Sequence, residues 1–222
     1  MRTFDEIFAI AADRKGGPDA LNAMLEPPLP RDELAKMPDD RWLSLFTRQV
    51  FNAGFNWKVI ENKWDGFEQA FHGFDVGKCA MMDDDWLDEL LRDTRIVRNG
   101  IKIQTVRDNA IFLQELAQEH GSAAKAIANW PSDDYIGLLE LLKTRGSRLG
   151  GTTGQYALRF AGVDGFILSR DVVARLIAEG VIDKQPTSKR AQAQVQQAFT
   201  DWQAQSGRSL KEISRVLAMS IG

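Results

Sequence analysis

Apolar side chains recur along most of the chain at intervals of three and four residues, which is the period of an amphipathic α-helix. The clearest stripe lies in Arg41–Ala53, where the inward positions are Trp42, Leu45, Phe46, Gln49, Val50 and Ala53. A second stripe, in Ile101–Gln118, is formed by Ile103, Val106, Ala110, Leu113 and Ala117. The alternation that is typical of β-strands is scarce. The pattern therefore predicts an all-α fold.

The same period predicts further, shorter helices. They cover Phe4–Ala12, Asp83–Leu91, Tyr135–Thr144, Asp171–Glu179 and Lys189–Gln205, and another begins after Asn56 and carries Trp57, Ile60 and Trp64. Capping side chains precede three of the predicted helices, in Pro38-Asp39-Asp40, at Asn56 and in Ser132-Asp133-Asp134. The run Pro27-Pro28-Leu29-Pro30 cannot lie inside a helix and predicts an extended connector.

Length and composition place the chain among globular proteins. Of its 222 residues, 44% are apolar and 27% are charged, which excludes long disordered or collagen-like stretches. The N-terminus has no long apolar core, and no apolar run approaches the roughly 18 residues of a membrane span. We therefore expect a cytoplasmic protein that does not bind membranes. The single cysteine, Cys79, excludes an internal disulfide.

The charge is unevenly distributed along the chain, whose formal net charge is −3. Residues 143–222 contain 12 Lys and Arg against 6 Asp and Glu, whereas residues 1–142 contain 16 against 25. This asymmetry favours an anionic partner for the C-terminal part, although solvated helices often show a similar imbalance.

The segment 143–160, with the sequence KTRGSRLGGTTGQYALRF, carries the most specific chemistry. One helix is expected to end at Gly146, and another to begin at Thr152 and Thr153. Gly150 and Gly151 permit positive φ angles and a close approach of backbone N–H groups to a ligand.

Together with the following helix N-terminus, those amides would form a site for an anion, with Arg145 and Arg148 beside it. The alternative is a plain pair of antiparallel helices with a glycine-rich corner.

Three blocks of sequence and this hairpin resemble the bacterial type I 3-methyladenine DNA glycosylase family, in the same order and at compatible spacing. The blocks are FTRQVFNAGFNW at 46–57, FEQAFHGFD at 67–75, and RIVRNGIKIQ at 95–104 followed by Asn109-Ala110. The resemblance covers about residues 38–165. It implies the two-lobed helical bundle of the helix-hairpin-helix glycosylases, in which the hairpin holds a DNA phosphate through Arg145, Arg148 and Gly150–Thr153.

On this resemblance we expect a single glycosylase-like unit over residues 1–222. A central helical lobe would cover about 38–130 and a helix-hairpin-helix lobe about 131–185, with the N- and C-terminal helices packing on the lobes.

The resemblance also implies a structural zinc ion, held by two Cys and two His near the chain ends. This chain has only Cys79, in mid-chain, and the scattered His72 and His120, which do not show the spacing of zinc ligands. We therefore expect no metal and no other cofactor, and expect packing of the terminal extensions to stabilise the fold instead.

The resemblance places the base-binding site around Trp57, with Phe55 nearby. Gln49 stands eight residues before Trp57, where the family has a glutamate. A glutamine offers a donor and an acceptor but no charge, so Gln49 would read an edge of the base without attracting a cation. The alternative is that Gln49 and Trp57 are ordinary core side chains.

Asp171 follows Gly151 by 20 residues, a spacing that resembles the position of the catalytic aspartate in the wider superfamily. The type I family usually lacks this residue. We take Asp171 and Gln49 as the candidate catalytic residues. The alternative for Asp171 is a helix cap or a first-turn charge.

These features together predict a base-excision repair glycosylase that hydrolyses the N-glycosidic bond of a flipped-out, alkylated purine. The expected partner is double-stranded DNA with a damaged base, in the bacterial cytoplasm, and a monomer is expected. Two alternatives remain: a non-catalytic protein that binds damaged DNA, and a helical interaction domain that has lost DNA binding.

Overall fold

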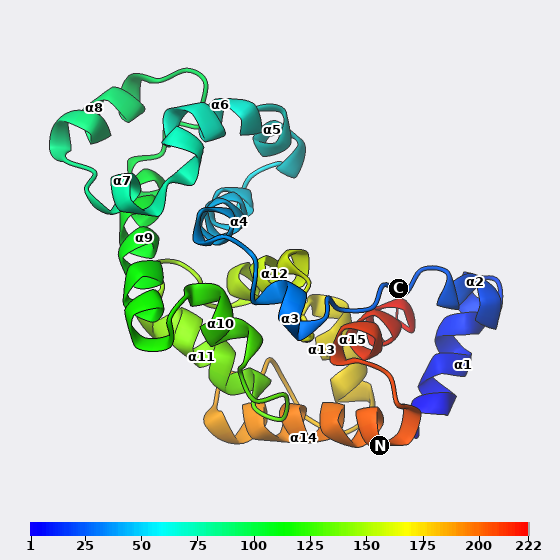
Figure 1. Ribbon diagram of the computed structural model, residues 1–222. Coiled ribbons are helices and arrows are strands. Elements are labelled where there is room, and N and C mark those ends of the chain that lie inside the picture. Colours follow the sequence, from blue (N-terminus) through cyan, green and yellow to red (C-terminus); the bar gives the residue numbers. More distant parts are fainter. Residues whose placement is uncertain (222) are drawn as a thin grey trace. The chain divides into compact units, whose positions relative to one another are not determined.

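The computed structural model describes residues 1–221, and every regular element in that range is a helix (Figure 1). The prediction of an all-α fold is confirmed. The α-helices are α1 (Phe4–Lys15), α2 (Pro18–Asn22), α3 (Arg31–Leu34), α4 (Asp39–Asn52), α5 (Trp57–Asn62), α6 (Trp64–Ala70), α7 (Val76–Ala80), α8 (Asp84–Arg92), α9 (Gly100–His120), α10 (Ala123–Ala128), α11 (Tyr135–Arg145), α12 (Thr152–Ala161), α13 (Arg170–Ala178), α14 (Lys189–Ser206) and α15 (Leu210–Met219). One 3-10 helix, η1, covers His72–Phe74.

The longer predicted helices are present, but several details of the prediction were wrong. The short helices α2, α3, α7 and α10 were not predicted, and no side chain caps α4, because its N-cap residue is Pro38. Residues 57–64 do not form one helix, because the chain breaks at Lys63 between α5 and α6. The helix α15 was missed altogether, although Ser209 and Glu212 form a capping box at its start. The proline-rich run 27–30 is extended, as predicted.

The chain divides into two compact units. The first contains residues 1–29, 131–137 and 162–222, and the second contains residues 30–130 and 138–161. This division differs from the predicted lobes, about 38–130 and 131–185, because α12 packs on α4 and therefore belongs with residues 30–130.

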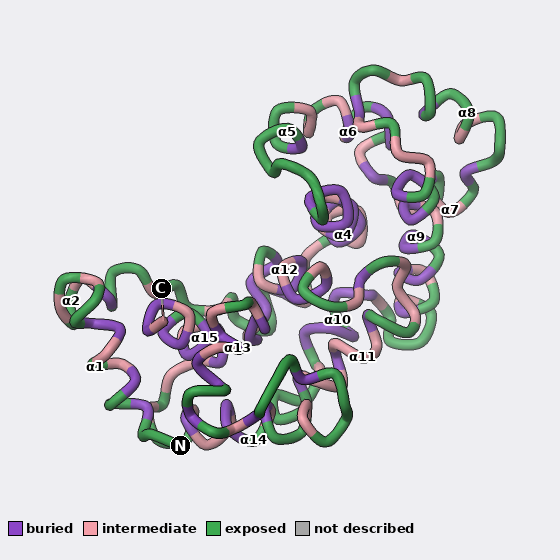
Figure 2. Tube along the Cα trace, turned by 180° about the vertical axis from the view of Figure 1, so that it is seen from behind, coloured by how far each residue is buried: buried purple, intermediate pink, exposed green. Residues whose placement is uncertain are grey.

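The second unit is built around α4, which contacts α9 and α12 and is buried along most of its length (Figure 2). An aromatic cluster covers another part of this core, where Phe71 stacks on both Phe67 and Phe74. Arg41 on α4 donates two hydrogen bonds to Glu68, at 2.9 and 3.0 Å, and therefore ties α4 to α6.

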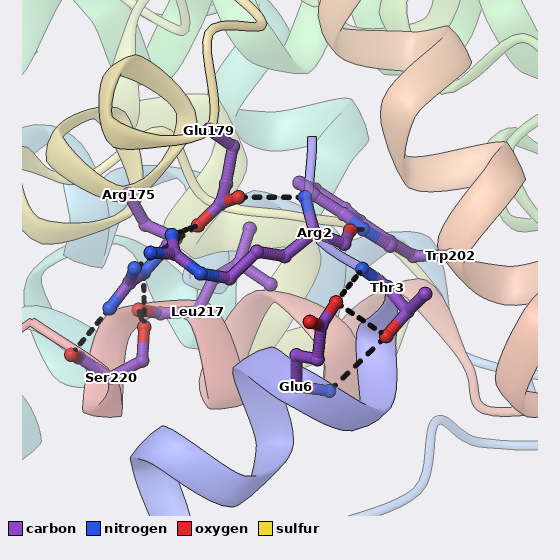
Figure 3. Close-up of polar contacts among 8 residues, drawn as sticks. All are labelled: Arg2, Thr3, Glu6, Arg175, Glu179, Trp202, Leu217 and Ser220. Carbon is purple, nitrogen blue, oxygen red and sulfur yellow. Dashed lines mark hydrogen bonds and ion pairs between the residues drawn. The ribbon is translucent and has the colours of Figure 1, made fainter.

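The first unit is formed by α1, α2, α13, α14 and α15, and a partly buried polar network joins its chain ends (Figure 3). The Arg2 backbone N–H and guanidinium donate to the Glu179 carboxylate at 2.9 and 2.8 Å. Arg175 donates to the same carboxylate at 3.1 Å and to the side chain and carbonyl of Ser220 at 2.7 Å each. The N-terminal segment, α13 and the end of α15 are therefore held together by the Glu179 carboxylate and the guanidinium groups of Arg2 and Arg175.

Within residues 1–221, no helix is both long enough and apolar enough to cross a membrane.

Candidate nucleic-acid interface

The glycine-rich segment forms the predicted tight corner between two helices. The first helix, α11, ends at Arg145, and the second, α12, begins at Thr152. Gly151 has a φ angle of 59°, in the left-handed region that favours glycine. Gly154, in the first turn of α12, is required for a different reason, because a Cβ atom there would collide with the carbonyl oxygen of Leu149.

Asn109 of α9 fixes the shape of this corner. Its Oδ1 accepts a hydrogen bond from the Ser147 N–H at 2.8 Å, and its Nδ2 donates to the Ser147 carbonyl at 3.1 Å. Asn109 is fully buried. The Asn109 side chain therefore hydrogen-bonds both the N–H and the carbonyl of Ser147, as the backbone of a neighbouring β-strand would. Sequence reasoning saw Asn109 only as part of a family block and did not foresee this role.

The two arginines of the hairpin have different environments. Arg145 donates to both carboxylate oxygens of Glu119 at 2.8 Å and to Glu115 at 3.0 Å, which braces α11 against α9. The hydrogen bonds from Arg145 to Glu119 and Glu115 raise the pKa of its guanidinium above the already high ordinary value. The Arg145 guanidinium is thus already paired with these carboxylates, and its expected contact with DNA stays a prediction.

Arg148 is the available cation of the corner. It is exposed, and within the described residues 1–221 it forms no hydrogen bond or ion pair. Its φ angle of 59° is uncommon for a residue with a side chain, and this conformation is held by the same corner that Asn109 clamps. The geometry at Arg148, Gly151, Thr152 and Thr153 is therefore compatible with the predicted grip on a phosphate.

Trp57 lies at the start of α5, which Asn56 caps by accepting a hydrogen bond from the Lys58 N–H at 3.0 Å. The indole is 44% exposed, so the reading of Trp57 as an ordinary core side chain was wrong. It packs edge-on against Tyr156 and Phe160 of α12, with ring centroids 5.4 and 6.1 Å away. The Trp57 indole is therefore held in place by packing on α12, the second helix of the hairpin.

Gln49 is buried in α4 and pairs with Asn52, one turn further along the same helix. Its Oε1 accepts a hydrogen bond from Asn52 Nδ2 at 3.3 Å. The Asn52 Oδ1 is buried and has no hydrogen-bond partner within residues 1–221. This part of α4 thus holds two neutral amides and no carboxylate.

Lys102 is a further residue that sequence reasoning missed. It is only 7% exposed, and its Nζ donates to the carbonyl oxygens of Phe51 and Ala53 at 3.2 and 2.6 Å. Burial and the charge of Arg148 lower the pKa of this amine. A lysine in the first turn of a helix is usually solvated, so its burial could not be predicted from the sequence.

Asp171 belongs to the first unit, whereas the other candidate residues belong to the second. It lies in the first turn of α13 and forms an ion pair with Arg170 at 3.3 Å. The N-cap of α13 is Ser169, whose hydroxyl accepts the Val172 N–H. The alternative in which Asp171 caps the helix is therefore wrong, and that of a first-turn charge fits its position.

The residues present do not fit the zinc site that the family resemblance implies. Cys79 is buried with its Sγ 3.5 Å from the Phe71 carbonyl oxygen, and burial raises the pKa of its thiol to about 12. The thiolate that zinc prefers is therefore disfavoured. Over residues 1–221, no three His, Cys, Asp or Glu side chains gather in a way that could hold a metal ion.

This all-helical architecture is the fold of the 3-methyladenine DNA glycosylases. A 3-methyladenine DNA glycosylase I variant in complex with 3-methyladenine superposes with a TM-score of 0.53, at 22% identity, over 72% of this chain and 94% of its own. The Staphylococcus aureus 3-methyladenine DNA glycosylase I gives a TM-score of 0.52, at 22% identity, over 70% and 90%.

Sequence comparison finds a family match over part of the chain. Residues 35–137 match the methyladenine glycosylase family, so the predicted resemblance is confirmed over that part of the chain. The Escherichia coli (strain K12) DNA-3-methyladenine glycosylase 1 is 34% identical over 66 residues, which are 30% of this chain and 35% of that protein. The chain thus matches about a third of the length of this curated relative, and the hairpin corner lies beyond the matched family region.

Proposed function

We propose that this protein is a DNA glycosylase that hydrolyses the N-glycosidic bond of a damaged purine extruded from double-stranded DNA. The observation that carries the proposal is the clamped corner with its unpaired Arg148, in the same unit as the exposed Trp57. An enzyme that extrudes a base needs both a hold on the backbone and an aromatic surface to receive the base. The family match over residues 35–137 supports the same activity.

The corner would hold a phosphate through backbone N–H groups at the start of α12 and through Arg148. The N-terminus of α12 adds the positive end of its dipole, which favours an anion there. Such contacts fix the position of the DNA and carry no sequence information. We assign Arg145 a supporting role, because its guanidinium is already paired with Glu115 and Glu119.

Trp57 would stack on the extruded base, with Phe55 beside it on the α4–α5 connection. The pair of Gln49 and Asn52 would read the edge of the base through neutral amides. Because no carboxylate stands at position 49, the site would not select a cationic base by charge. One structural relative binds 3-methyladenine, so 3-methyladenine is the first lesion to test, together with neutral damaged purines.

Asp171 is our proposed catalytic carboxylate, on the strength of its spacing from Gly151. Cleavage of the N-glycosidic bond builds positive charge on the sugar as the base departs with the bonding electrons. A carboxylate near that charge stabilises the transition state and orients the attacking water. An alkylated purine is a good leaving group and needs little protonation.

The test is a panel of duplex oligonucleotides, each with one defined lesion, assayed for base release under single-turnover conditions. The proposal expects release from at least one purine lesion and none from undamaged DNA. If the protein binds damaged DNA but releases no base from any lesion, it is a non-catalytic damage-binding protein. If it shows no salt-dependent binding to DNA, DNA is excluded as its partner.

A further inference from the structure

Lys102 is a buried cation in an unfavourable place. It is the third residue of α9, where the positive end of the helix dipole opposes a positive side chain. It is also only 7% exposed, so its ammonium has lost most of its hydration. Within residues 1–221 it forms no ion pair with a carboxylate that would offset this cost.

Carbonyl groups at the end of α4 compensate for the lost hydration of the Lys102 ammonium. The Nζ donates to the Ala53 carbonyl oxygen at 2.6 Å and to the Phe51 carbonyl oxygen at 3.2 Å. Phe51 lies in the last turn of α4 and Ala53 is the C-cap residue, at the end where the helix dipole is negative and where intrahelical partners are missing. The ammonium of α9 thus takes the place of a C-cap for α4.

The same ammonium also contacts the base-binding loop. It lies 4.6 Å from the ring centroid of Phe55 and 5.8 Å from that of Phe51, both within the range of cation–π attraction. Between them the chain turns at Gly54, whose φ angle is 76°. One charge therefore contacts the residues before and after the turn that leads from α4 to Trp57.

Arg148, in the hairpin corner, interacts electrostatically with Lys102. Its charge acts on Lys102, and no acidic side chain pairs with either cation within the described residues. A phosphate bound at Arg148 would offset the repulsion between the two cations. Lys102 thus contacts the base-binding loop and is also acted on by the charge of Arg148.

We propose that Lys102 is a positioning residue, whose ammonium holds the 51–55 turn so that Phe55 and Trp57 are presented to the extruded base. The inference rests on the proposed function for its purpose, but the holding itself can be measured without activity. Lys102 touches the loop and not the reacting atoms, so its loss should affect base capture more than attachment to the DNA backbone.

The test compares wild type with Lys102→Met, which keeps the aliphatic stem and removes the charge, by amide hydrogen exchange. We expect exchange at residues 53–57 to accelerate by about tenfold or more, because the turn opens locally. Exchange in the middle of α9 should stay unchanged. The exposed Lys125→Met on α10 is the matched control and should alter neither region.

A second variant keeps the test decisive if Lys102→Met does not fold. Lys102→Gln retains one donor without the charge and should show a smaller acceleration at residues 53–57. Unchanged exchange at 53–57 in folded variants would overturn the proposal. Failure of both variants to fold would also overturn it, because Lys102 would then be a core residue of the whole unit.

Activity gives the second readout. In Lys102→Met, single-turnover base release should fall about tenfold while affinity for undamaged duplex DNA changes less than about twofold, because the backbone contacts remain. A wild-type protein that releases no base from any lesion would contradict the proposed function, and the exchange comparison would still decide whether Lys102 holds the turn.

Discussion

The Asn109 side chain replaces a backbone partner for Ser147, accepting from its N–H at 2.8 Å and donating to its carbonyl at 3.1 Å. This pairing transmits the rigidity of the 21-residue helix α9 to the corner that carries Arg148 and Gly151. The shape of the proposed phosphate site is therefore determined by a residue that is fully buried and cannot touch DNA.

Asn109→Ala should loosen this corner. Removing the amide leaves the Ser147 N–H without its partner and should lower the free energy of unfolding by about 1–2 kcal/mol. DNA affinity should fall by a similar factor on every sequence, because phosphate contacts are not sequence-specific. Urea denaturation and fluorescence anisotropy measure the two effects. The exposed Asn129→Ala is the control, and full DNA affinity in Asn109→Ala would exclude the corner from the interface.

Arg148 and Arg145 make a matched pair for the DNA contact. Arg148→Gln should weaken DNA binding and reduce the slope of log K against log salt by about one, with stability unchanged. Arg145→Gln should lower stability, because it removes the ion pairs with Glu115 and Glu119, and should leave that slope unchanged. Salt titrations of both variants decide the assignment, and the reverse pattern would show that Arg145 is the phosphate ligand.

Stability should depend on pH through Glu179. Burial opposes ionisation of this carboxyl, but the hydrogen bonds from Arg2 and Arg175 outweigh it, so its pKa is lowered from the ordinary value of 4.5. The contribution of Glu179 is therefore fully present above pH 4.5 and is lost as the pH falls from there towards the lowered pKa. In Glu179→Gln the free energy of unfolding should be lower at pH 7 and should change less between pH 5 and pH 3 (approximate limits of the carboxylate range).

The control for this experiment is the exposed Glu33→Gln, whose pH profile should follow that of wild type. If Glu179→Gln and wild type lost stability in parallel below pH 4.5, the carboxylate network of Figure 3 would not be the source of the acid sensitivity.

Substitutions of Asp171 and Ser169 distinguish a catalytic role from a capping role at the start of α13. Ser169→Ala removes the N-cap and should cost about 1 kcal/mol of stability with the rate of base release intact. Asp171→Asn should leave stability and DNA affinity near normal but reduce base release by about two decades, equivalent to ~3 kcal/mol of transition-state stabilisation. Melting temperatures and single-turnover rates on the same samples test both. A fully active Asp171→Asn would end the catalytic assignment.

Much of the fold could be predicted because the helices of this chain follow a simple period. The stripe of α4 and the cap at Asn56 are local signals, and both are present in the structure. The break at Lys63 could not be predicted in this way, because Trp57 and Trp64 keep helical spacing across it while only Trp57 turns to solvent. The helix α15 was predictable from Ser209 and Glu212 and was overlooked.

The site was less predictable, because its residues acquire their roles through distant contacts. Arg145 and Arg148 are equivalent basic residues in the sequence, and only the carboxylates of α9 distinguish them. Lys102 has the sequence environment of a solvated lysine, and its burial follows from the packing of α4 against α9. Glycine at position 151 could be interpreted locally, because the φ angle there is a property of the backbone itself.

The most direct test of the account is detection of the released base. Duplex DNA with a single alkylated adenine is incubated with wild-type protein or Asp171→Asn, and the products are separated by chromatography. The account predicts that wild type releases the free methylated base and leaves an abasic site, and that Asp171→Asn binds the same DNA but releases the base about 100-fold more slowly. Tight, salt-dependent binding by wild type with no free base from any damaged purine would contradict it.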